Sequence, residues 1–517
     1  ISYTKTMSQL EIVTPLHHIW EVISSWIDTE RLRAVMLFDP VNPLLFNTGL
    51  FLLLAVAFFF LYRLLSRWSG ARMVCIILFS LYFYYKSSAE CCFILLGVCL
   101  SDYLLGIILG NVRNRILRRC IVAVNVIVNI GMLVYFKYLN LIFSTFASIG
   151  GTDFDALDII LPAGISFFTF RSISYIVDIY RGTLRPATNL LDYIFFLTFF
   201  PPLLAGPVVR AADMLPQIKR RPVATRAMVG AGLFLIICGL IKKVIVADYI
   251  SGNFVDRVFD NPALYTGLEN LLAVYGFTLQ LYCDFSGYSD MAIGLALLLG
   301  FSFKDNFNAP FKSQSPTEWW RRWHISLSTW LRDYLYIPMG GSRCSVKRSY
   351  ANQFNTMLLG GLWHGASWMY IIWGAWNGIL LVVHKALRKA FPAPPGVRRD
   401  QWWRRVANTF LTFNLMAVGF MFFRARSMEH VGQMVGQIFT NFHVSVAPQL
   451  IEGYLAVMLL MLAGYLMHFA PRRWSDTLRD HYIALRPIWQ AVILAIVLLV
   501  IIQVRSSRIV PFIYLQY

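Results

Sequence analysis

The stretch Met36–Phe60, MLFDPVNPLLFNTGLFLLLAVAFFF, ends in an apolar run that starts near residue 44. A helix that crosses the hydrocarbon core of a bilayer needs roughly 20 mainly apolar residues. Comparable runs recur along the chain, near 73–86, 89–110, 120–143, 159–180, 190–209, 228–249, 268–300, 353–370, 371–386, 407–423, 451–470 and 488–504. The sequence therefore predicts an all-α polytopic membrane protein.

The composition supports this prediction. The chain has 517 residues, of which 57% are hydrophobic and 14% charged, whereas ordinary soluble domains carry roughly 25% charged residues. One oversized core does not explain the shortfall, because soluble chains split into domains beyond ~250–300 residues. A soluble enzyme is excluded.

Several apolar runs are too short or too interrupted to cross a bilayer alone. The run 190–209 contains three prolines, and the segment 326–341 contains Arg332 and Asp333. Non-helical backbone at membrane depth persists only where protein or a water-filled cavity covers it. We therefore expect about 10–13 transmembrane helices plus one or two re-entrant segments around a central tunnel.

The charge is strongly basic, with 46 Lys+Arg against 27 Asp+Glu and a net charge of +19. Lys and Arg accumulate in the cytoplasmic loops of membrane proteins, so we interpret the excess as topology and expect no nucleic-acid partner. The alternation of basic and acidic connections predicts an outside start before residue 44 and a cytosolic position for residues 301–352. Arg424 and Arg426 would then fall outside, against the rule.

We expect residues 36–517 to form one membrane domain and residues 1–35 to be an N-terminal extension, either amphipathic or dispensable. No internal repeat is visible, which counts against a transporter built from two related halves.

Ionisable residues at membrane depth are costly and are candidates for function. The first group lies in LQLYCDFSGYSDMAIGLALLLGF, residues 279–301. Asp284 and Asp290 are six residues apart and do not share a helical face, so they are not an obvious acid/base pair. Two interpretations stay open: a structural hydrogen-bonding role, or substrate binding together with the hydroxyls of Ser286 and Tyr288.

The second group lies in SPTEWWRRWHISLSTWLRDYLYIPMGGSR, residues 315–343. Trp and Arg at this density are typical of anchoring at the membrane interface. Alternatively the segment forms a cationic mouth for phosphate groups, with His324 at its inner end. Its candidate substrate-binding residues are Arg321, Arg322, Trp323, Asp333 and Tyr334, with further phosphate contacts expected from Arg343, Lys347 and Arg348.

The third group lies in MLLGGLWHGASWMYIIWGAWNG, residues 357–378, where His364 follows Trp363 without an adjacent charge. A lone histidine in apolar surroundings is usually a core residue. Here we expect the neighbouring glycines, among them Gly361 and Gly365, to leave the ring accessible to a narrow substrate. Imidazole suits proton transfer near neutral pH. We predict His364 as a catalytic residue, with Trp363 among the residues at the substrate; no histidine or cysteine spacing predicts a metal site.

These segments resemble, in order, the membrane-bound O-acyltransferase family, and within it the bacterial branch that acetylates cell-surface polysaccharides such as alginate and peptidoglycan. The resemblance covers about residues 36–517. It is carried by LPAGISFFTFRSISYIVDIYRG at 161–182, FFPPLLAGPVVRA at 199–211, GLIKKVIVAD at 239–248, DFSGYSDMAIG at 284–294, WRRWHISLSTWLRDYLYIPMGGSR at 320–343, LLGGLWHGASW at 358–368 and the final PFIYLQY.

The resemblance implies that His364 is the catalytic histidine of the tryptophan–histidine–glycine motif and that His324 is a second catalytic histidine. It also implies acetyl-CoA as cytosolic donor substrate, with no permanently bound cofactor. The acceptor would be a polysaccharide outside the cell, reached with an exported SGNH-type acetyltransferase partner. The location would be the bacterial cytoplasmic (inner) membrane.

Two alternatives remain at this point. One is transfer of D-alanine or another acyl group from a carrier protein. The other is a transporter or flippase for a lipid-linked sugar, which would explain the broken helices and the basic face but not a histidine among glycines.

Overall fold

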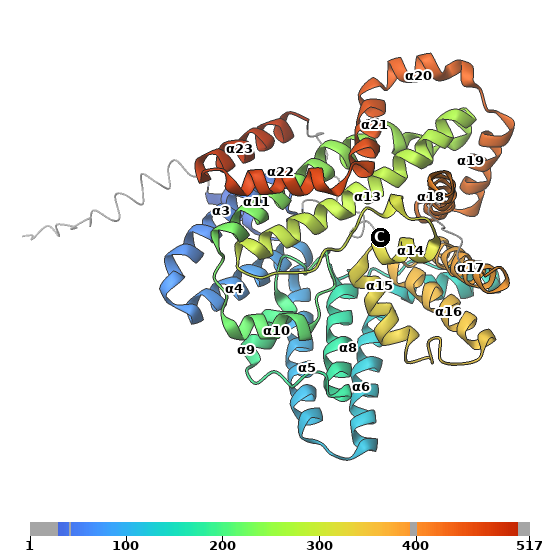
Figure 1. Ribbon diagram of the computed structural model, residues 1–517. Helices are drawn as coiled ribbons and strands as arrows, with labels where there is room; N and C mark the ends of the chain where they lie inside the picture. The colour runs from blue at the N-terminus through green and yellow to red at the C-terminus, as the bar shows by residue number, and fades with distance from the viewer. Residues whose placement is uncertain (1–28, 41–42, 393–400, 505–517) are drawn as a thin grey trace, which may run out of the picture.

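The computed structural model describes residues 29–40, 43–392 and 401–504, and these residues form helices and connections without any strand. Figure 1 shows the helices gathered around the long α13 (Gly267–Leu298). The all-α fold class is confirmed. Of the predicted extension 1–35, only α2 (Thr29–Met36) begins within the described residues; residues 1–28 lie outside them, and the domain boundary stays a prediction.

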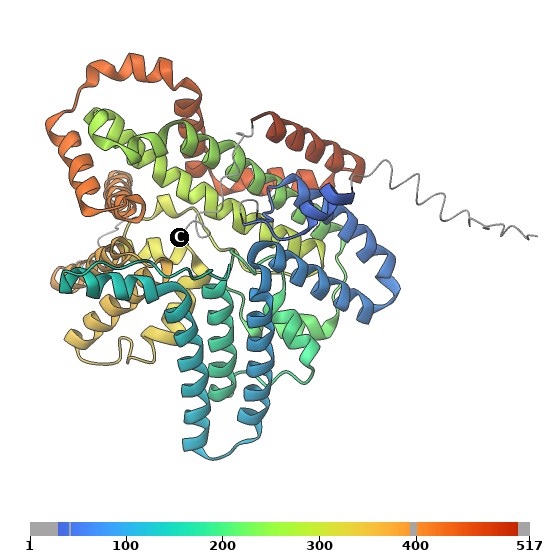
Figure 2. The ribbon, with the colours of Figure 1, turned by 180° about the vertical axis from the view of Figure 1, so that it is seen from behind.

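The N-terminal third contributes a group of long helices. In Figures 1 and 2, α5, α6 and α8 run side by side and project from the body. The helices of this third are α3 (Gly49–Leu64), η1 (Leu65–Arg67), α4 (Ser69–Ser88), η2 (Ala89–Cys91), α5 (Cys92–Asn111), α6 (Arg115–Leu133), η3 (Val134–Tyr138), α7 (Leu139–Gly150) and α8 (Ile165–Arg181).

Buried polar side chains join α5, α6 and the following α9 (Leu190–Thr198). Asn125 Nδ2 donates to Asp102 Oδ1 at 2.7 Å, and the Tyr193 hydroxyl donates to Asp102 Oδ2 at 2.7 Å. Polar groups away from water need partners within the protein. This cluster therefore fixes the three helices relative to one another.

The middle of the chain pairs α11 (Arg226–Leu240) with α13 at very short range. A Cβ placed on Gly287 would lie 2.8 Å from the carbonyl oxygen of Gly239. Only glycine permits this approach, so Gly287 lets α11 and α13 pack closely. The remaining elements here are α10 (Ala211–Arg220), η4 (Ile241–Asp248), η5 (Ser251–Val255), α12 (Asp256–Asp260) and η6 (Pro262–Leu264).

The C-terminal part supplies the walls of the site. Short elements lead from α13 into it: η7 (Pro310–Lys312), α14 (Pro316–Arg322), α15 (Ile325–Leu331) and η8 (Arg332–Tyr336). Longer helices follow: α16 (Val346–His364), α17 (Trp368–Ala390), α18 (Trp402–Arg424), α19 (Met428–Thr440), η9 (Val444–Val446), α20 (Ala447–Gly453), α21 (Leu455–Phe469), α22 (Arg472–Ala484) and α23 (Pro487–Val504).

Seven helices of the described residues are long and apolar enough to cross a membrane, or up to eight if the bent pair Val444–Gly453 and Leu455–Phe469 is one span. The number is below the expected ten to thirteen partly because α4 and α5 form one continuous helical stretch, Ser69–Asn111. These helices support the assignment as a multi-pass membrane protein.

The two interrupted segments are broken as expected. The run 190–209 is helical only to Thr198 and continues as buried irregular backbone, and the segment 326–341 is helical to Tyr336 and then turns. Protein covers the irregular backbone of the first segment, as its depth requires.

Arg424 and Arg426, which depart from the charge rule, are neutralised where they lie. Arg424 pairs with Asp256 at 2.8 Å, and Arg426 pairs with Asp260 at 2.7 Å. Both carboxylates belong to α12 (Asp256–Asp260), so each arginine has a partner close to where it lies.

Candidate active site

His364 is the last residue of α16, and its ring is enclosed by aromatic side chains. The ring centroid lies 5.0 Å from that of Trp363, 4.8 Å from Trp373 on α17 and 5.5 Å from Phe423 on α18. The helix ends here because Gly365 is extended and Ser367 caps α17, accepting from the backbone N–H of Met369. Three helices thus hold an imidazole that is 4% exposed.

The backbone carbonyls beside this histidine are bound by a distant segment. Lys137 Nζ, from η3, donates to the carbonyl of Trp363 at 2.7 Å and to that of His364 at 3.1 Å. The Tyr138 hydroxyl donates to the carbonyl of Leu362 at 2.7 Å. The last carbonyls of a helix lack intrahelical partners and favour a nearby cation. Sequence reasoning missed Lys137, whose only signal was a lone cation inside an apolar run.

His324 is fully buried at the start of α15, with a backbone φ of 41°. A left-handed conformation costs a non-glycine residue roughly 1–3 kcal/mol and persists only where the surroundings enforce it. Here Asn306 enforces it: its carbonyl oxygen accepts from the N–H of Ile325 at 2.9 Å, and its Oδ1 lies 3.2 Å from His324 Nδ1.

The same asparagine sets the tautomer of His324. Asn306 Nδ2 donates to Ser289 Oγ at 3.1 Å, so Asn306 Oδ1 is the acceptor toward the histidine. His324 Nδ1 therefore carries the hydrogen and Nε2 holds the lone pair. His324 Nε2 is buried and makes no hydrogen bond within the described part of the chain. The second histidine thus turns the lone pair of Nε2 toward the protein interior.

The two histidines both lie close to one tryptophan. The ring of Trp363 is 6.3 Å from that of His324 and 5.0 Å from that of His364. Phe170 of α8 stacks on Trp363 at 5.1 Å and holds it in place. The structure thus brings together His364, His324 and Trp363, which are separate in the sequence.

The DFSGYS stretch of α13 reaches this site with other residues than the ones predicted. The Phe285 ring lies 4.5 Å from that of His324, and Ser289, one turn further on, binds Asn306. Tyr288 points elsewhere and stacks on Phe46 at 4.7 Å. Ser286 is buried in α13, and within the described residues its hydroxyl makes no hydrogen bond to either histidine. The rotation of α13 about its own axis decides which of its residues face the site, and the sequence alone did not reveal that rotation. In the structure these residues are Phe285 and Ser289.

Asp284 and Asp290 are bound in ion pairs with η4. Lys243 Nζ lies 2.5 Å from Asp284 Oδ1 and 2.8 Å from Asp248 Oδ1, while Lys242 Nζ lies 2.7 Å from Asp290 Oδ2. Both carboxylates tie α13 to the helix beside it. This arrangement favours the structural interpretation over donor binding.

A basic cavity of about 600 Å³ opens between α14, α15, α16 and α17. Its lining includes Thr356 and Met357 of α16, the latter two turns before His364, about 10 Å along the same helix face. No carboxylate is among the lining residues, and its cations are Arg321, Arg332, Lys385, Arg388 and Lys389.

Only some of the cations predicted from sequence line the cavity. Arg321 lines it, whereas Arg322 turns away and pairs with Glu318 at 2.8 Å. Trp323 is a packing residue, with its ring 5.5 Å from that of Trp319. Arg343, Lys347 and Arg348 are not among the lining residues, and α17 supplies the additional cations instead.

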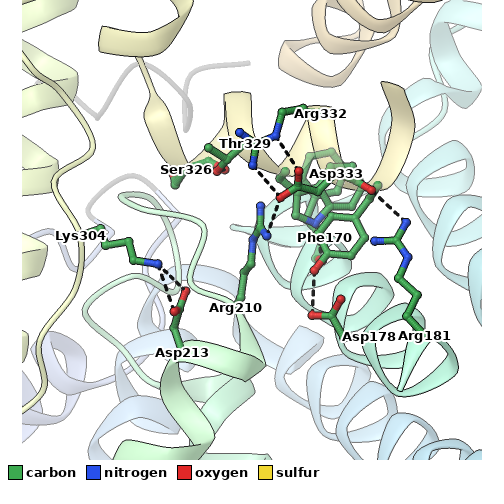
Figure 3. A network of polar contacts seen from close by, with 12 residues as sticks. Phe170, Asp178, Arg181, Arg210, Asp213, Lys304, Ser326, Thr329, Arg332 and Asp333 are labelled. Atoms are coloured by element: carbon green, nitrogen blue, oxygen red, sulfur yellow. Dashed lines mark hydrogen bonds and ion pairs between the residues drawn. The ribbon is translucent and has the colours of Figure 1, made fainter. Parts of the chain in front are cut away.

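Asp333 and Tyr334 take part in a polar network next to Arg332, which lines the cavity. Figure 3 shows Asp333 with Arg210 and Arg332. Arg210 Nη1 donates to Asp333 Oδ2 at 2.8 Å, and the Tyr334 hydroxyl donates to Asp178 Oδ2 at 2.8 Å. Burial acts to raise the pKa of the Asp333 carboxyl, but hydrogen bonds from Arg332 and Arg210 outweigh it and hold that pKa below its ordinary value. The network fastens η8 to α8 and α10 rather than facing the histidines.

The glycines around His364 serve helix packing, so the expectation that they expose its ring was wrong. A Cβ on Gly361 would lie 2.4 Å from the carbonyl oxygen of Tyr370, and one on Gly365 would lie 2.2 Å from the Tyr370 ring. The space that these glycines leave is occupied by α17. Access to His364 must come along another direction.

No group of three or more His, Cys, Asp or Glu side chains in the described ranges is placed to hold a metal ion.

A multi-pass helical protein with two buried histidines beside one tryptophan, and a basic cavity below them, has the features of a membrane-embedded enzyme. Residues 184–423 match the MBOAT family, membrane-bound O-acyltransferases. The chain belongs to this family and is an integral membrane O-acyltransferase. The matched residues contain both histidines and every residue that lines the basic cavity.

The chain is similar to named members of the bacterial branch. It is 43% identical over 404 residues to the probable alginate O-acetylase AlgI of Pseudomonas aeruginosa, covering 76% of this chain and 74% of that protein. It is 34% identical over 433 residues to the peptidoglycan O-acetyltransferase of Helicobacter pylori, covering 77% and 80%. A teichoic acid D-alanyltransferase of Bacillus subtilis is 28% identical over 278 residues, covering 52% and 69%.

Proposed function

We propose that the protein passes an acetyl group from cytosolic acetyl-CoA across the bacterial inner membrane for O-acetylation of a cell-surface polysaccharide. The observation that carries this proposal is the carboxylate-free basic cavity that lies on the same face of α16 as His364. The relatives named as alginate and peptidoglycan O-acetylating enzymes support acetyl as the group and a polysaccharide as the final acceptor.

The cavity suits the nucleotide end of coenzyme A. Coenzyme A is polyanionic, and guanidinium and ammonium groups form the strong, charge-assisted hydrogen bonds that phosphates accept. The five cations come from three helices, so they surround the ligand rather than meeting it on one side. The narrow pantetheine arm would follow α16 from Met357 toward His364.

His364 is proposed as the general base and His324 as its partner. The imidazole of His364 takes the proton from an acceptor hydroxyl, the oxygen attacks the thioester carbonyl, and the C–S bond breaks to release coenzyme A as a thiol after proton transfer. His324 either orients the acceptor or stabilises charge, for which its Nε2 lone pair and rigid mounting on Asn306 are suited.

The remaining components of the proposal come from the family resemblance. The acetyl group would reach an exported SGNH-type acetyltransferase, which completes transfer to the sugar. A positive cytosolic face, with residues 301–352 inside, would place the donor cavity where acetyl-CoA is made.

The activity is tested with purified protein in proteoliposomes. Acetyl-CoA labelled in the acetyl group is expected to release free coenzyme A, with label appearing on acceptor polysaccharide when the exported partner is present. A D-alanyl-loaded carrier protein is the matched alternative donor. Turnover with the carrier but not with acetyl-CoA would replace this proposal, and coenzyme A release distinguishes an acyltransferase from a sugar transporter.

The donor cavity makes its own prediction. The double variant Lys385→Gln/Arg388→Gln is expected to raise the KM for acetyl-CoA by about tenfold, equivalent to about 1.4 kcal/mol, with kcat largely kept. The reason is that phosphate contacts remote from the thioester are made equally in ground and transition states.

The matched control is Lys347→Gln/Arg348→Gln, which removes the same charge from exposed residues outside the cavity. Steady-state kinetics with varied acetyl-CoA is the measurement. An equal rise in KM for the control would indicate instead that the phosphate groups bind at the loop expected from sequence.

A further inference from the structure

A second cavity, of about 580 Å³, lies between α18 and α21, with η7 at one end. Its walls are largely apolar and aromatic, including Phe410, Phe413, Tyr465 and Phe469. It shares no lining residue with the basic cavity. Phe311 of η7 and Trp319 of α14, with ring centroids 5.9 Å apart, pack together beside it.

The polar groups of this cavity include two cations, Lys312 and Arg405, and no carboxylate lines it. Lys312 Nζ donates one hydrogen bond, to the carbonyl of Ala470 at 2.6 Å, and an ammonium group carries three donors. The nearby carboxylate Glu318 is bound by Arg322 at 2.8 Å. The Lys312 ammonium group therefore has donors to offer an occupant of the cavity.

The charge and the apolar wall are separated along α18. Arg405 is in its first turn, and Thr409 and Phe413 follow at intervals of one turn on the same face, about 12 Å in all. Trp402 and Trp403 at this end are 72% and 51% exposed, and exposed tryptophans with arginines mark the bilayer interface. The cations thus lie at headgroup depth and the aromatic wall extends into the hydrocarbon region.

We propose that this cavity binds an anionic phospholipid of the surrounding bilayer, with its phosphate at Lys312 and Arg405 and an acyl chain along Phe410 and Phe413. Basic pockets between transmembrane helices at the cytoplasmic side are typical sites for anionic headgroups. The volume lies within the roughly 300–1,000 Å³ of small-molecule sites. The bound lipid would fill the gap between α18 and α21 and so steady the helix that carries Phe423 to His364.

The experiment measures lipid retention by native mass spectrometry of the detergent-purified full chain, incubated with phosphatidylglycerol or with phosphatidylcholine. Retention of phosphatidylglycerol is expected to exceed that of phosphatidylcholine. The variant Lys312→Gln/Arg405→Gln is expected to retain phosphatidylglycerol at least about tenfold more weakly. The control Arg113→Gln/Arg119→Gln removes equal charge from two exposed residues, one just before α6 and one in its first turns, and is expected to leave retention unchanged.

A second variant keeps the charges and fills the space. Thr409→Phe places a ring in the cavity and is expected to lower phosphatidylglycerol retention as well. Equal retention of both lipids by the native chain, retention unaffected by either variant, or preferential retention of an added polyprenyl phosphate would overturn the proposal.

Discussion

Replacing His364 by Gln is expected to lower kcat for acetyl transfer by about 10²–10⁴-fold, the contribution of a positioned general base. The KM for acetyl-CoA should change little, because the cations proposed to bind the donor line a cavity that His364 does not line. The variant is expected to fold, since glutamine has a similar size and the cage of Trp363, Trp373 and Phe423 is retained. Acetyl-CoA turnover by purified protein, normalised to folded protein, is the measurement.

His468 offers a matched control. It is also a buried histidine, 9% exposed, and its Nε2 accepts from the backbone N–H of Phe311 at 3.1 Å. His468→Gln removes an imidazole on α21 that packs on Tyr282 and Phe311, away from Trp363. Its kcat per folded molecule should match the native value. Full activity of the His364 variant, or an equal loss in the His468 variant, would contradict the assignment of His364 as base.

The fold class could be predicted from sequence because apolar runs long enough to cross a bilayer indicate directly that the helices lie in lipid. The number of spans could not, since the same runs either continue one helix, as at Ser69–Asn111, or end at irregular buried backbone, as after Thr198. Which of these occurs depends on packing against other segments rather than on the run itself.

Both histidines could be singled out because an isolated imidazole in apolar sequence is a local feature. Their supports could not, because Asn306 and Lys137 reach them through folding, the latter across 227 residues of chain. The basic mouth shows the same limit. Arg321 was found in its own motif, whereas Lys385 and Arg388 sit at the end of α17, where their local pattern is that of an ordinary charged helix terminus.

The paired carboxylates of α13 were noticed without their partners, although a signal existed. Lys242 and Lys243 interrupt an apolar run in the segment 239–248, and charges at membrane depth need opposite charges nearby. Matching those lysines with Asp284 and Asp290 would have favoured the structural interpretation before the geometry was known.

That interpretation leads to the largest expected effect on stability. Lys243→Met is expected to destabilise the protein by about 3–5 kcal/mol, because removing one member of a buried ion pair leaves uncompensated charge. The Lys243 side chain is 2% exposed, and its loss removes the ammonium group that pairs with both Asp284, 6% exposed, and Asp248. The measurement is thermal unfolding of the purified protein together with its monodisperse yield.

Lys304→Met is the matched control, because Lys304 also pairs with an aspartate, Asp213 at 3.2 Å, but with a side chain that is 85% exposed. An exposed pair contributes roughly 0.2–1 kcal/mol, so this variant should unfold close to the native midpoint. Adding Asp284→Asn to Lys243→Met should recover part of the lost stability, since it removes one of the two carboxylate charges that Lys243 pairs with. If Lys243→Met were as stable as Lys304→Met but raised the KM for acetyl-CoA, the pair would belong to donor binding. If Lys243→Met loses stability and the rescued double variant keeps the native KM for acetyl-CoA, these charges serve to hold α13 against η4. Phe285 and Ser289 are then the residues through which α13 supports His324.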